Sequence, residues 1–423
     1  MAFICYYWNS FMEPQTILYV IIIITILGYV FDQVLDILNL KARKDHLPDD
    51  IAAFYDRQKY FRSLDYHQEL TRFSFLTSAF SVILSLAMLW FGGFGWIDNW
   101  LGGVFDSSIV RALAFFGILM FASDVLTTPL QLYRIFVIEE KYGFNKTSLR
   151  TFFADKLKGY VLGALIGGAL LSVLMYLIQV LGQDFWIWFA LIASAFVLLM
   201  NMFYTSLILP LFNKLTPLPD GPLKHEIEAF ARKVDFPLDN IFVIDGSKRS
   251  SKANAFFSGI GKKKKIVLYD TLINNHTVDE LVAVLAHEVG HFKKKHIVQS
   301  YVLAIVQVVF TLFVLSRMVF NENVSLALGG QELSIPLNLV AFGILFSPIS
   351  AVTGLFMSML SRKNEFEADA YAKSTFSGEA LSTALKKLSV DSLSNLYPHP
   401  LYVFFHYSHP PLLRRLKALS QST

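Results

Sequence analysis

The sequence predicts an all-α integral membrane protein with seven transmembrane helices and a small α+β domain on the cytoplasmic side. Of the 423 residues, 54% are hydrophobic and 17% are charged, and the mean hydropathy is +0.48. Soluble globular proteins carry about 25% charged residues. Several apolar stretches also reach the roughly 20 residues that a helix needs to cross the hydrocarbon core. These features exclude a soluble globular protein.

The first apolar segment is predicted to be a retained span. It lacks the basic leading segment and the Ala-x-Ala-like cleavage site of a signal peptide. Polar residues inside the spans, such as Asp124 and Asn201, are expected to face a water-filled chamber or to make interhelical contacts. The seven predicted spans cover about residues 16–38, 73–97, 109–130, 159–182, 185–212, 297–320 and 335–360.

The distribution of Lys and Arg predicts the orientation in the membrane. Residues 1–40 contain neither, the connection to the second span contains seven, and the third connection contains six. Because short basic loops stay cytoplasmic, the N-terminus is expected outside or in the lumen and the C-terminus in the cytoplasm. The membrane would be the endoplasmic reticulum in a eukaryotic host and the inner membrane in a bacterium. The net charge of +4 predicts no nucleic-acid partner.

The predicted spans divide the chain into four regions. Residues 1–212 form a five-span membrane region, 213–296 a cytoplasmic catalytic region, 297–360 the sixth and seventh spans, and 361–423 a cytoplasmic tail. Within the catalytic region, the pattern predicts a helix over 225–234 and strands over 241–244 and 266–269. Residues 254–258 are a further strand candidate.

A zinc-binding pattern stands at the end of the catalytic region, in His287-Glu288-Val289-Gly290-His291. On a helix, His287 and His291 share one face and can hold one ion. Glu288 can then serve as the general base that activates a metal-bound water. The alternative is a helix with two surface histidines. The single cysteine excludes a cysteine-based zinc site.

A catalytic zinc site needs a third protein ligand and one open position. One zincin class takes its third ligand from the last histidine of His-Glu-x-x-His-x-x-Gly-x-x-His. Here Lys294 occupies the position of the glycine and Ile297 that of the last histidine. Glu365, just after the seventh span, is the strongest candidate, because antiparallel sixth and seventh spans place both motifs at one membrane face. Asp369, one turn later, could accept the second N–H of a ligand histidine, or it could be an exposed helix carboxylate.

An ordered set of further motifs resembles the type I CAAX prenyl proteases, which are integral-membrane zinc proteases. The resemblance extends over most of the chain. Its motifs are residues 136–145, 210–219, 246–251 and 254–257, the zinc pattern, Ser361-Arg362-x-x-Glu365-x-x-Ala368-Asp369, and residues 407–411 followed by Arg415. The loop at about 321–334 is shorter than in eukaryotic members, which leaves a bacterial source open.

The resemblance implies a role for each matching residue. Glu365 would complete a single zinc site, and Asn254, Ala255, Phe256 and Phe257 would pair with the substrate backbone. Without the resemblance, Phe256 and Phe257 would be expected in the core. His409 would donate to the developing oxyanion, and Arg415 would approach the site and bind the substrate. Without the resemblance, His409 would be expected in a surface turn. His296, His399 and His406 receive no role.

The predicted function is that of a membrane-embedded zinc metalloendopeptidase that acts on a peptide or protein substrate. The protein is expected to be a monomer, and the resemblance implies that it removes the C-terminal tripeptide after a prenylated cysteine. The first alternative is a quality-control protease of broad specificity with the same zinc chemistry. The second is a transporter or channel with a structural zinc, which is disfavoured because a structural site needs neither a neighbouring glutamate nor an open position.

Overall fold

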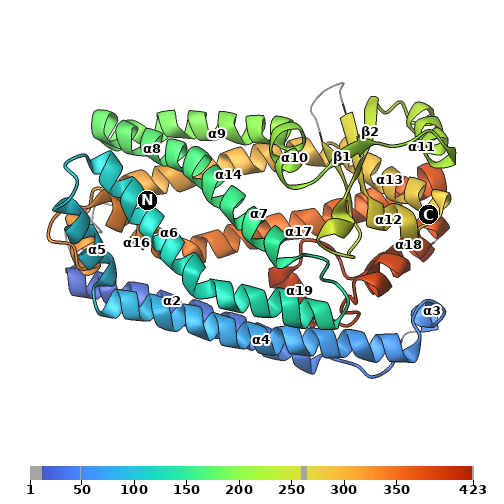
Figure 1. The fold of residues 1–423 in the computed structure, drawn as a ribbon, viewed down its shortest axis with the longest axis horizontal. Helices are drawn as coiled ribbons and strands as arrows, with labels where there is room; N and C mark the ends of the chain where they lie inside the picture. Colours follow the sequence, from blue (N-terminus) through green and yellow to red (C-terminus); the bar gives the residue numbers. More distant parts are fainter. Residues whose placement is uncertain (1–11, 48, 259–263, 422–423) are drawn as a thin grey trace.

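Long helices make up most of the molecule in a computed structural model, which describes residues 12–47, 49–258 and 264–421. They run roughly along its longest dimension, and the sheet gathers with shorter helices at one end (Figure 1). The long helices are α2 (Pro14–Lys41), α4 (Arg57–Trp90), α6 (Ser108–Tyr133), α7 (Leu149–Leu162), α8 (Gly168–Leu181), α9 (Phe185–Phe203), α14 (His296–Met318) and α17 (Ser347–Ala372).

Shorter helices connect and cap the long ones. At the end away from the sheet lie α5 (Gly93–Gly102), α15 (Glu322–Ala327) and α16 (Ile335–Leu345). The others are α3 (Asp49–Ala52), α10 (Leu209–Phe212), α11 (Pro222–Lys233), α12 (Asp270–Asn275), α13 (Val278–Lys293), α18 (Gly378–Asp391), α19 (Pro400–His406) and α20 (Leu412–Ser420). The π-helical turns of the long helices are at Arg134–Glu139, Gly163–Gly167, Tyr204–Ile208 and Lys373–Ser377.

Five helical stretches of the described chain are long and apolar enough to cross a membrane, and a bent pair makes a sixth. The predicted fourth and fifth spans both fall in one stretch, Leu149–Phe212. The predicted seventh span is not straight, because α16 and α17 meet at an angle of 50°. Pro348, in the first turn of α17, lacks the backbone N–H that a continuous helix requires. The protein is therefore a mostly helical, multi-pass membrane protein.

Large apolar side chains are exposed along these helices. Leu27 on α2, Ile83 on α4 and Leu191 on α9 are each more than 60% exposed. Contiguous apolar surface of this kind marks a membrane-facing region. A separate buried cluster joins α8, α9, α14 and α16 on their inner sides, through residues that include Ile178, Phe185, Leu312 and Phe342.

The sheet has four strands in the order β1-β2-β4-β3. Its strands are β1 (Leu215–Pro217), β2 (Leu238–Ile244), β3 (Ala255–Ser258) and β4 (Lys264–Tyr269). β2 and β4 are parallel, and the other two pairs are antiparallel. The predicted strands fall within β2 and β4, and β3 occupies 255–258 of the further candidate. β1 was missed, because a three-residue edge strand that ends in Pro217 has too little alternation to recognise.

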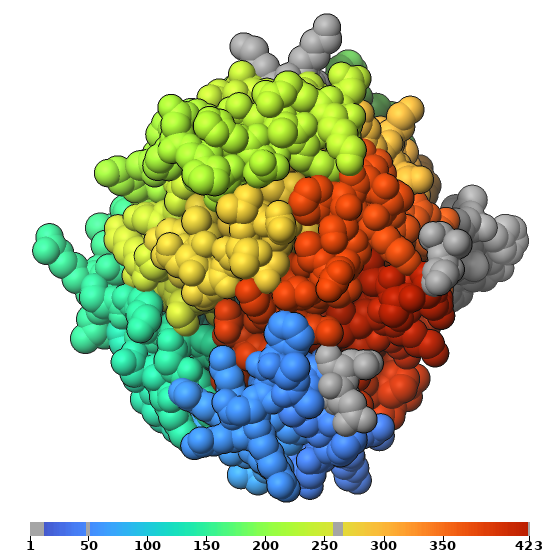
Figure 2. Space-filling model, turned by 90° about the vertical axis from the view of Figure 1, so that its right-hand side faces the viewer, coloured from blue at the N-terminus to red at the C-terminus, as the bar shows by residue number. Residues whose placement is uncertain are grey.

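The core beside the sheet is built by α11, α13 and α18. Ile227, Leu281 and Leu381 from these helices pack with Ile266 and Leu268 of β4. The predicted helix over 225–234 corresponds to α11, which begins three residues earlier at Pro222. Figure 2 shows this end of the molecule, where the yellow-green and gold segments meet the orange and red tail in one continuous surface.

Candidate metal centre

The helix that carries the two predicted ligand histidines, α13, has a strong start signal. The Thr277 hydroxyl accepts from the backbone N–H of Glu280, and the Glu280 carboxylate accepts from the backbone N–H of Thr277. This reciprocal capping satisfies two backbone donors that a helix start leaves unpaired. Most of the helix is buried between the sheet and α17, which holds His287 and His291 in a fixed orientation.

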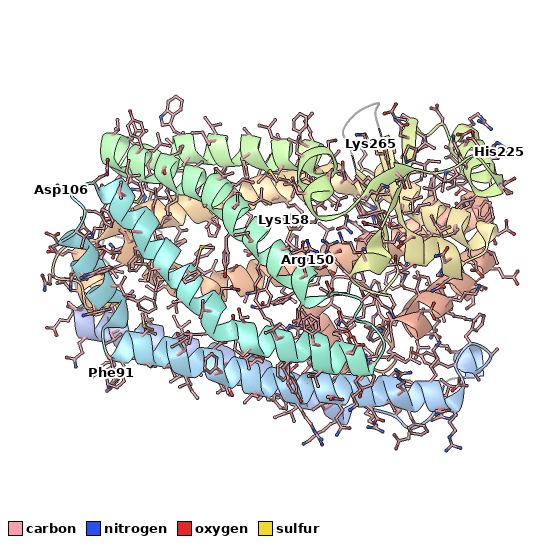
Figure 3. All side chains as sticks on the ribbon, viewed as in Figure 1. Phe91, Asp106, Arg150, Lys158, His225 and Lys265 are labelled. Carbon is pink, nitrogen blue, oxygen red and sulfur yellow. The ribbon has the colours of Figure 1, made fainter. Side chains whose placement is uncertain are left out.

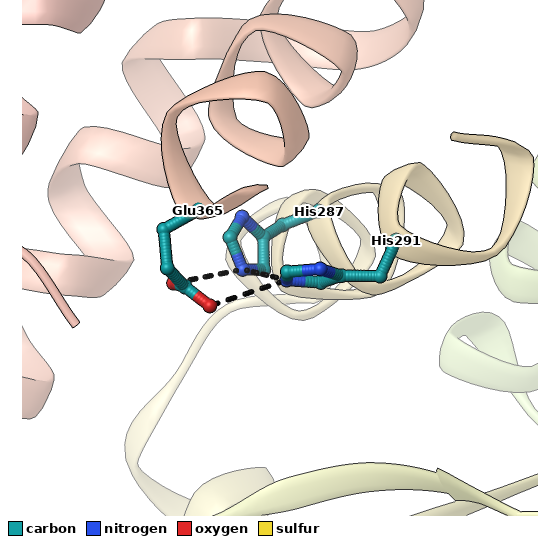
Figure 4. Close-up of side chains that lie close together, drawn as sticks. All are labelled: His287, His291 and Glu365. Carbon is teal, nitrogen blue, oxygen red and sulfur yellow. Dashed lines mark hydrogen bonds and ion pairs between the residues drawn. The ribbon is translucent and has the colours of Figure 1, made fainter. Parts of the chain in front are cut away.

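Three potential ligand atoms converge between α13 and α17 (Figure 4). Nε2 of His287 lies 3.2 Å from Nε2 of His291. Oε1 of Glu365 lies 3.3 Å from Nε2 of His291, and its Oε2 lies 3.5 Å from Nε2 of His287. His287 and Glu365 are 6% and 4% exposed. His291 is partly exposed, and the three residues thus form a compact, largely buried group that could hold a metal ion.

The spacing of these atoms fits a tetrahedral ion. Bonds of about 2.0–2.1 Å from zinc to nitrogen or oxygen place neighbouring ligand atoms of a tetrahedron about 3.3–3.4 Å apart. The two Nε2 atoms are 3.2 Å apart, and Oε1 of Glu365 is 3.3 Å from Nε2 of His291, which is close to this value. Oε2 of Glu365 is buried and makes no hydrogen bond in the described part of the chain, and its neighbours are Nε2 of His287 at 3.5 Å and Nη1 of Arg415 at 3.4 Å. Two imidazole nitrogens and one carboxylate are ligands that zinc takes in catalytic sites, so the donor set fits a bound cation.

Asp369 supports the first histidine. Its Oδ1 lies 2.9 Å from Nδ1 of His287, on the side of the ring opposite the ligand atom. Burial alone lowers the pKa of His287, but the contacts with Asp369 and Glu365 outweigh it and raise this pKa to about 9. Asp369 is 1% exposed, so it is not the exposed carboxylate of the alternative interpretation.

Arg415, on α20, forms a buried pair with Asp369. Its Nε and Nη2 donate to the two carboxylate oxygens over 2.8 and 2.6 Å. Its Nη1 lies 3.4 Å from Oε2 of Glu365. Burial lowers the pKa of Arg415, but Asp369 outweighs this effect and raises it, so the guanidinium stays charged. Its predicted contact with substrate stays a prediction.

Glu288 and His409 both lie beside the three converging residues. Glu288 is partly buried, and it forms no side-chain hydrogen bond with the described residues. Burial raises the pKa of Glu288, and the neighbouring His287 and His291 offset only part of this rise. His409 is on the segment between α19 and α20, with Nε2 3.4 Å from Oε1 of Glu365, and its side chain is 65% exposed. Both side chains can therefore meet a substrate at this site.

The predicted substrate-binding residues lie on an edge of the sheet. Ala255 and Phe256 pair with Leu268 and Val267 of β4, and the opposite side of β3 pairs with no strand among the described residues. The backbone N–H of Ala255 donates to the side-chain oxygen of Asn254 over 2.9 Å. The side chain of Phe257 lies outside the described residues.

Two residues near the site were not predicted. His296 lies against His291, and Glu367 lies against His296, although His296 received no role from the sequence. The only local signal was a third histidine five residues after His291, which is not a spacing that brings side chains together on one helix.

Asp124, one of the two polar residues inside the predicted spans, makes an interhelical ion pair. Its carboxylate lies 2.6 Å from Nζ of Lys156 on α7. Nearby, a cavity of about 520 Å³ lies between α2, α4, α6 and α19, with Asp36, Arg134 and Tyr407 among its lining residues. Polar groups therefore line space inside the membrane region close to the metal-binding end.

The fold and the site together define a membrane-embedded metallopeptidase, and comparisons with known proteins agree. The family model described as the CAAX prenyl protease N-terminal region, with five membrane helices, matches residues 36–214. The model of peptidase family M48 matches residues 217–423. These matches favour a peptidase over a transporter or channel with a structural metal.

Curated relatives match over nearly the whole chain. The CAAX prenyl protease 1 homolog of Oryza sativa is 35% identical over 407 residues, which cover 94% of this chain and 96% of the relative. CAAX prenyl protease 1 of Saccharomyces cerevisiae is 34% identical over 90% of this chain and 89% of its own length. The crystal structure of S. mikatae Ste24p matches with a TM-score of 0.90 at 32% identity, and covers 97% of this chain and all of that one.

The chain belongs to the CAAX prenyl protease 1 family of M48 metallopeptidases. It is a multi-pass membrane metalloendopeptidase, and its family implies a bound metal and a protein substrate. The predicted family and enzyme class are thereby confirmed.

Proposed function

We propose that this protein is a zinc-dependent CAAX prenyl protease that removes the C-terminal tripeptide after a prenylated cysteine. The observation that carries the proposal is the convergence of His287, His291 and Glu365, whose nitrogen and oxygen atoms lie 3.2–3.5 Å apart, in a chain whose relatives are named CAAX prenyl proteases. A quality-control protease of broad specificity would use the same site. The names of the relatives favour CAAX processing.

The metal is proposed to be zinc, held by His287, His291 and Glu365, one ion per chain. When bound, it supplies a Lewis acid that lowers the pKa of its water to about 7 and polarises the scissile carbonyl. Glu288 takes the proton of the attacking water and passes it to the leaving amine. Glu288 is next to His287 in the sequence and makes no side-chain hydrogen bond with the described residues, so its carboxylate is available for this proton transfer.

The substrate is proposed to bind as an added strand along β3. The free side of β3 presents backbone groups that can align any extended peptide, while side chains select among sequences. Asn254, Ala255, Phe256 and Phe257 would form this edge. The prenyl chain would lie in the apolar intramembrane space.

His409 is proposed to donate to the oxyanion that forms at the scissile carbonyl. Its exposed ring, with Nε2 3.4 Å from Oε1 of Glu365, borders the three proposed metal ligands. Arg415 would act mainly through Asp369 and Glu365, which its guanidinium contacts. The predicted contact of Arg415 with the substrate would also be made by the guanidinium.

We further propose seven membrane spans. The stretch Leu149–Phe212 has 64 residues, which would measure about 96 Å as a straight helix, far more than the roughly 30 Å hydrocarbon core. Gly182, in the left-handed region with a φ of 54°, ends α8 and lets the chain turn into α9. The bent pair of α16 and α17 would be the seventh span. The four-region division of the chain, with boundaries after 212, 296 and 360, follows from this count.

The proposed orientation places the sheet end in the cytoplasm and the N-terminus outside or in the lumen. Figure 3 shows Phe91 and Asp106 at one end of the molecule and His225 at the other. The connection at the first end, residues 91–107, contains no Lys or Arg, as expected for a non-cytoplasmic loop. We place a eukaryotic form in the endoplasmic reticulum and a bacterial form in the inner membrane, as a monomer.

The test combines zinc quantification with peptide cleavage by the purified protein and its Glu288→Gln variant. Each protein is given a farnesylated CAAX peptide and the same peptide without the farnesyl group. We expect one zinc per chain in both proteins, preferential cleavage of the farnesylated peptide, and a loss of about 10²–10⁴-fold in kcat for Glu288→Gln. Equal cleavage of the two peptides would remove the CAAX proposal, and undiminished cleavage by the variant would remove the mechanism.

A further inference from the structure

His296 lies directly behind the second ligand histidine. Its Nδ1 is 3.0 Å from Nδ1 of His291, and its Nε2 is 3.1 Å from Oε2 of Glu367. His296 is 5% exposed. We infer that His296 and Glu367 form a relay that positions His291 for metal binding. This inference rests on the proposed metal site and extends it by two positioning residues.

The contact atoms allow one arrangement of protons when both rings are neutral. If Nε2 of His291 binds the metal, the ring proton of His291 must be on Nδ1. That N–H then donates to Nδ1 of His296, which leaves the proton of His296 on Nε2. This second N–H donates to the carboxylate of Glu367, which accepts it. Every ring nitrogen therefore has a matching partner, and the relay selects the tautomer of His291 that exposes Nε2 to the metal.

The two ligand histidines are supported in different ways from the same helix. Asp369 contacts Nδ1 of His287 directly at 2.9 Å, as metal-bound histidines commonly require. Glu367 is two residues away from both Asp369 and Glu365, so at 3.6 residues per turn it points to a different side of α17. From there it reaches His291 only through the ring of His296.

The backbone is bent to make this contact. Residues five apart on a continuous helix do not face each other, so His296 could not meet His291 if α13 continued. Instead α13 ends at Lys293 and α14 begins at His296. Between them Lys295 adopts a left-handed conformation with a φ of 60°. This conformation is unfavourable for a residue with a side chain, and strained residues cluster at functional sites.

The test compares the zinc affinity of the purified full-length protein and four variants by chelator competition, together with visible spectra of the Co²⁺-loaded forms. His296→Phe keeps a ring but removes both nitrogens. His296→Asn retains an oxygen near the position of Nδ1, and Glu367→Gln keeps the shape of the carboxylate. The matched control is Gln299→Leu, which breaks the neighbouring α14–α17 hydrogen bond with Asn364, 3.2 Å long.

We expect His296→Phe to weaken zinc binding about 10- to 100-fold and to alter the Co²⁺ spectrum. His296→Asn should recover part of this loss, and Gln299→Leu should bind zinc as the wild type does. Zinc affinity of His296→Phe within twofold of wild type would overturn the relay, and so would an equal loss in Gln299→Leu. If His296→Phe does not fold, the zinc affinity of Glu367→Gln decides instead. The side chain of Glu367 is 38% exposed, so this substitution should not prevent folding. A wild type that binds no zinc would instead refute the proposed function.

Discussion

Gly290 packs against the backbone of Ala368, so that a Cβ on Gly290 would lie only 3.0 Å from Cα of Ala368. This contact joins α13 and α17 beside the candidate metal centre. Gly290 stands between the two proposed ligand histidines, and Ala368 is three residues after Glu365. The close approach of the two backbones therefore brings Glu365, the proposed third ligand on α17, within reach of the histidines.

The first prediction concerns this contact. Gly290→Val should lower zinc affinity at least tenfold and lower the melting temperature, because its side chain would push α17 and Glu365 away from the histidines. Overpacking of this kind costs about 1–3 kcal/mol. The matched control is Gly354→Ala on α17, where nothing lies within 4 Å of the added Cβ. A Gly290→Val protein that binds zinc like the control would show that helix contact does not set the ligand geometry.

The second prediction concerns the buried pair of Asp369 and Arg415. Asp369→Asn should weaken zinc binding about 10- to 100-fold, because His287 loses its carboxylate partner. It should also destabilise the fold by about 3–5 kcal/mol, because the buried Arg415 is left without its main counter-charge. Thermal unfolding and chelator competition measure the two effects. Unchanged stability would mean that Glu365 alone suffices to balance Arg415.

The third prediction is a pH dependence of zinc uptake by the metal-free protein. The pKa of His287 is about 9 without metal, because the contacts with Asp369 and Glu365 outweigh the lowering effect of burial. Zinc must displace the proton from the ring below that pH, so the affinity should rise with pH, up to about tenfold per unit between pH 7 and 9, and level off above. Chelator competition across this range gives the slope. A flat profile would contradict protonation of His287 in the metal-free site.

The fourth prediction concerns the free edge of β3. Tyr269 donates its backbone N–H to the carbonyl oxygen of Asn254 over 3.1 Å. Backbone groups alternate in direction along an antiparallel strand, so those of Phe256 also point toward β4, while those of Ala255 and Phe257 point away from it. Phe257→Pro should therefore leave the sheet intact but remove one donor to the substrate. We expect kcat/KM to fall about tenfold beyond any effect of Phe257→Ala, in line with one lost hydrogen bond.

Zinc content and circular dichroism serve as controls for this fourth prediction, because both should match the wild type in the two variants. If Phe257→Pro and Phe257→Ala cleave equally well, the substrate does not bind the backbone of residue 257.

Much of the membrane architecture could be predicted from the sequence. A polar side chain in lipid is unfavourable wherever it stands, so each membrane-spanning stretch must consist mostly of apolar residues. The apolar stretches and the deficit of charge indicated a multi-pass helical protein. The bend between α16 and α17 was not predicted, although Pro348 marks its position. The turn at Gly182 lies at the boundary between the predicted fourth and fifth spans.

The spacing of His287 and His291 determined a shared helix face by itself, since four residues make about one helical turn. Two observations predicted Glu365 as the third ligand. Lys294 and Ile297 occupy the positions where one zincin class has its glycine and third histidine, and two antiparallel spans place Glu365 at the same membrane face as the histidines. The structure brings its carboxylate to the histidines, 74 residues farther along the chain than His291.

Only the tertiary structure decided what surrounds His287, His291 and Glu365. The pairing of Arg415 with Asp369, the closeness of Gly290 to Ala368 and the contact of His296 with both His291 and Glu367 join elements that no sequence period relates. Helical and strand periods report which residues share a face of one element. Which faces meet depends on the packing of whole elements, and in one case on a single left-handed residue, Lys295, that ends one helix and starts the next.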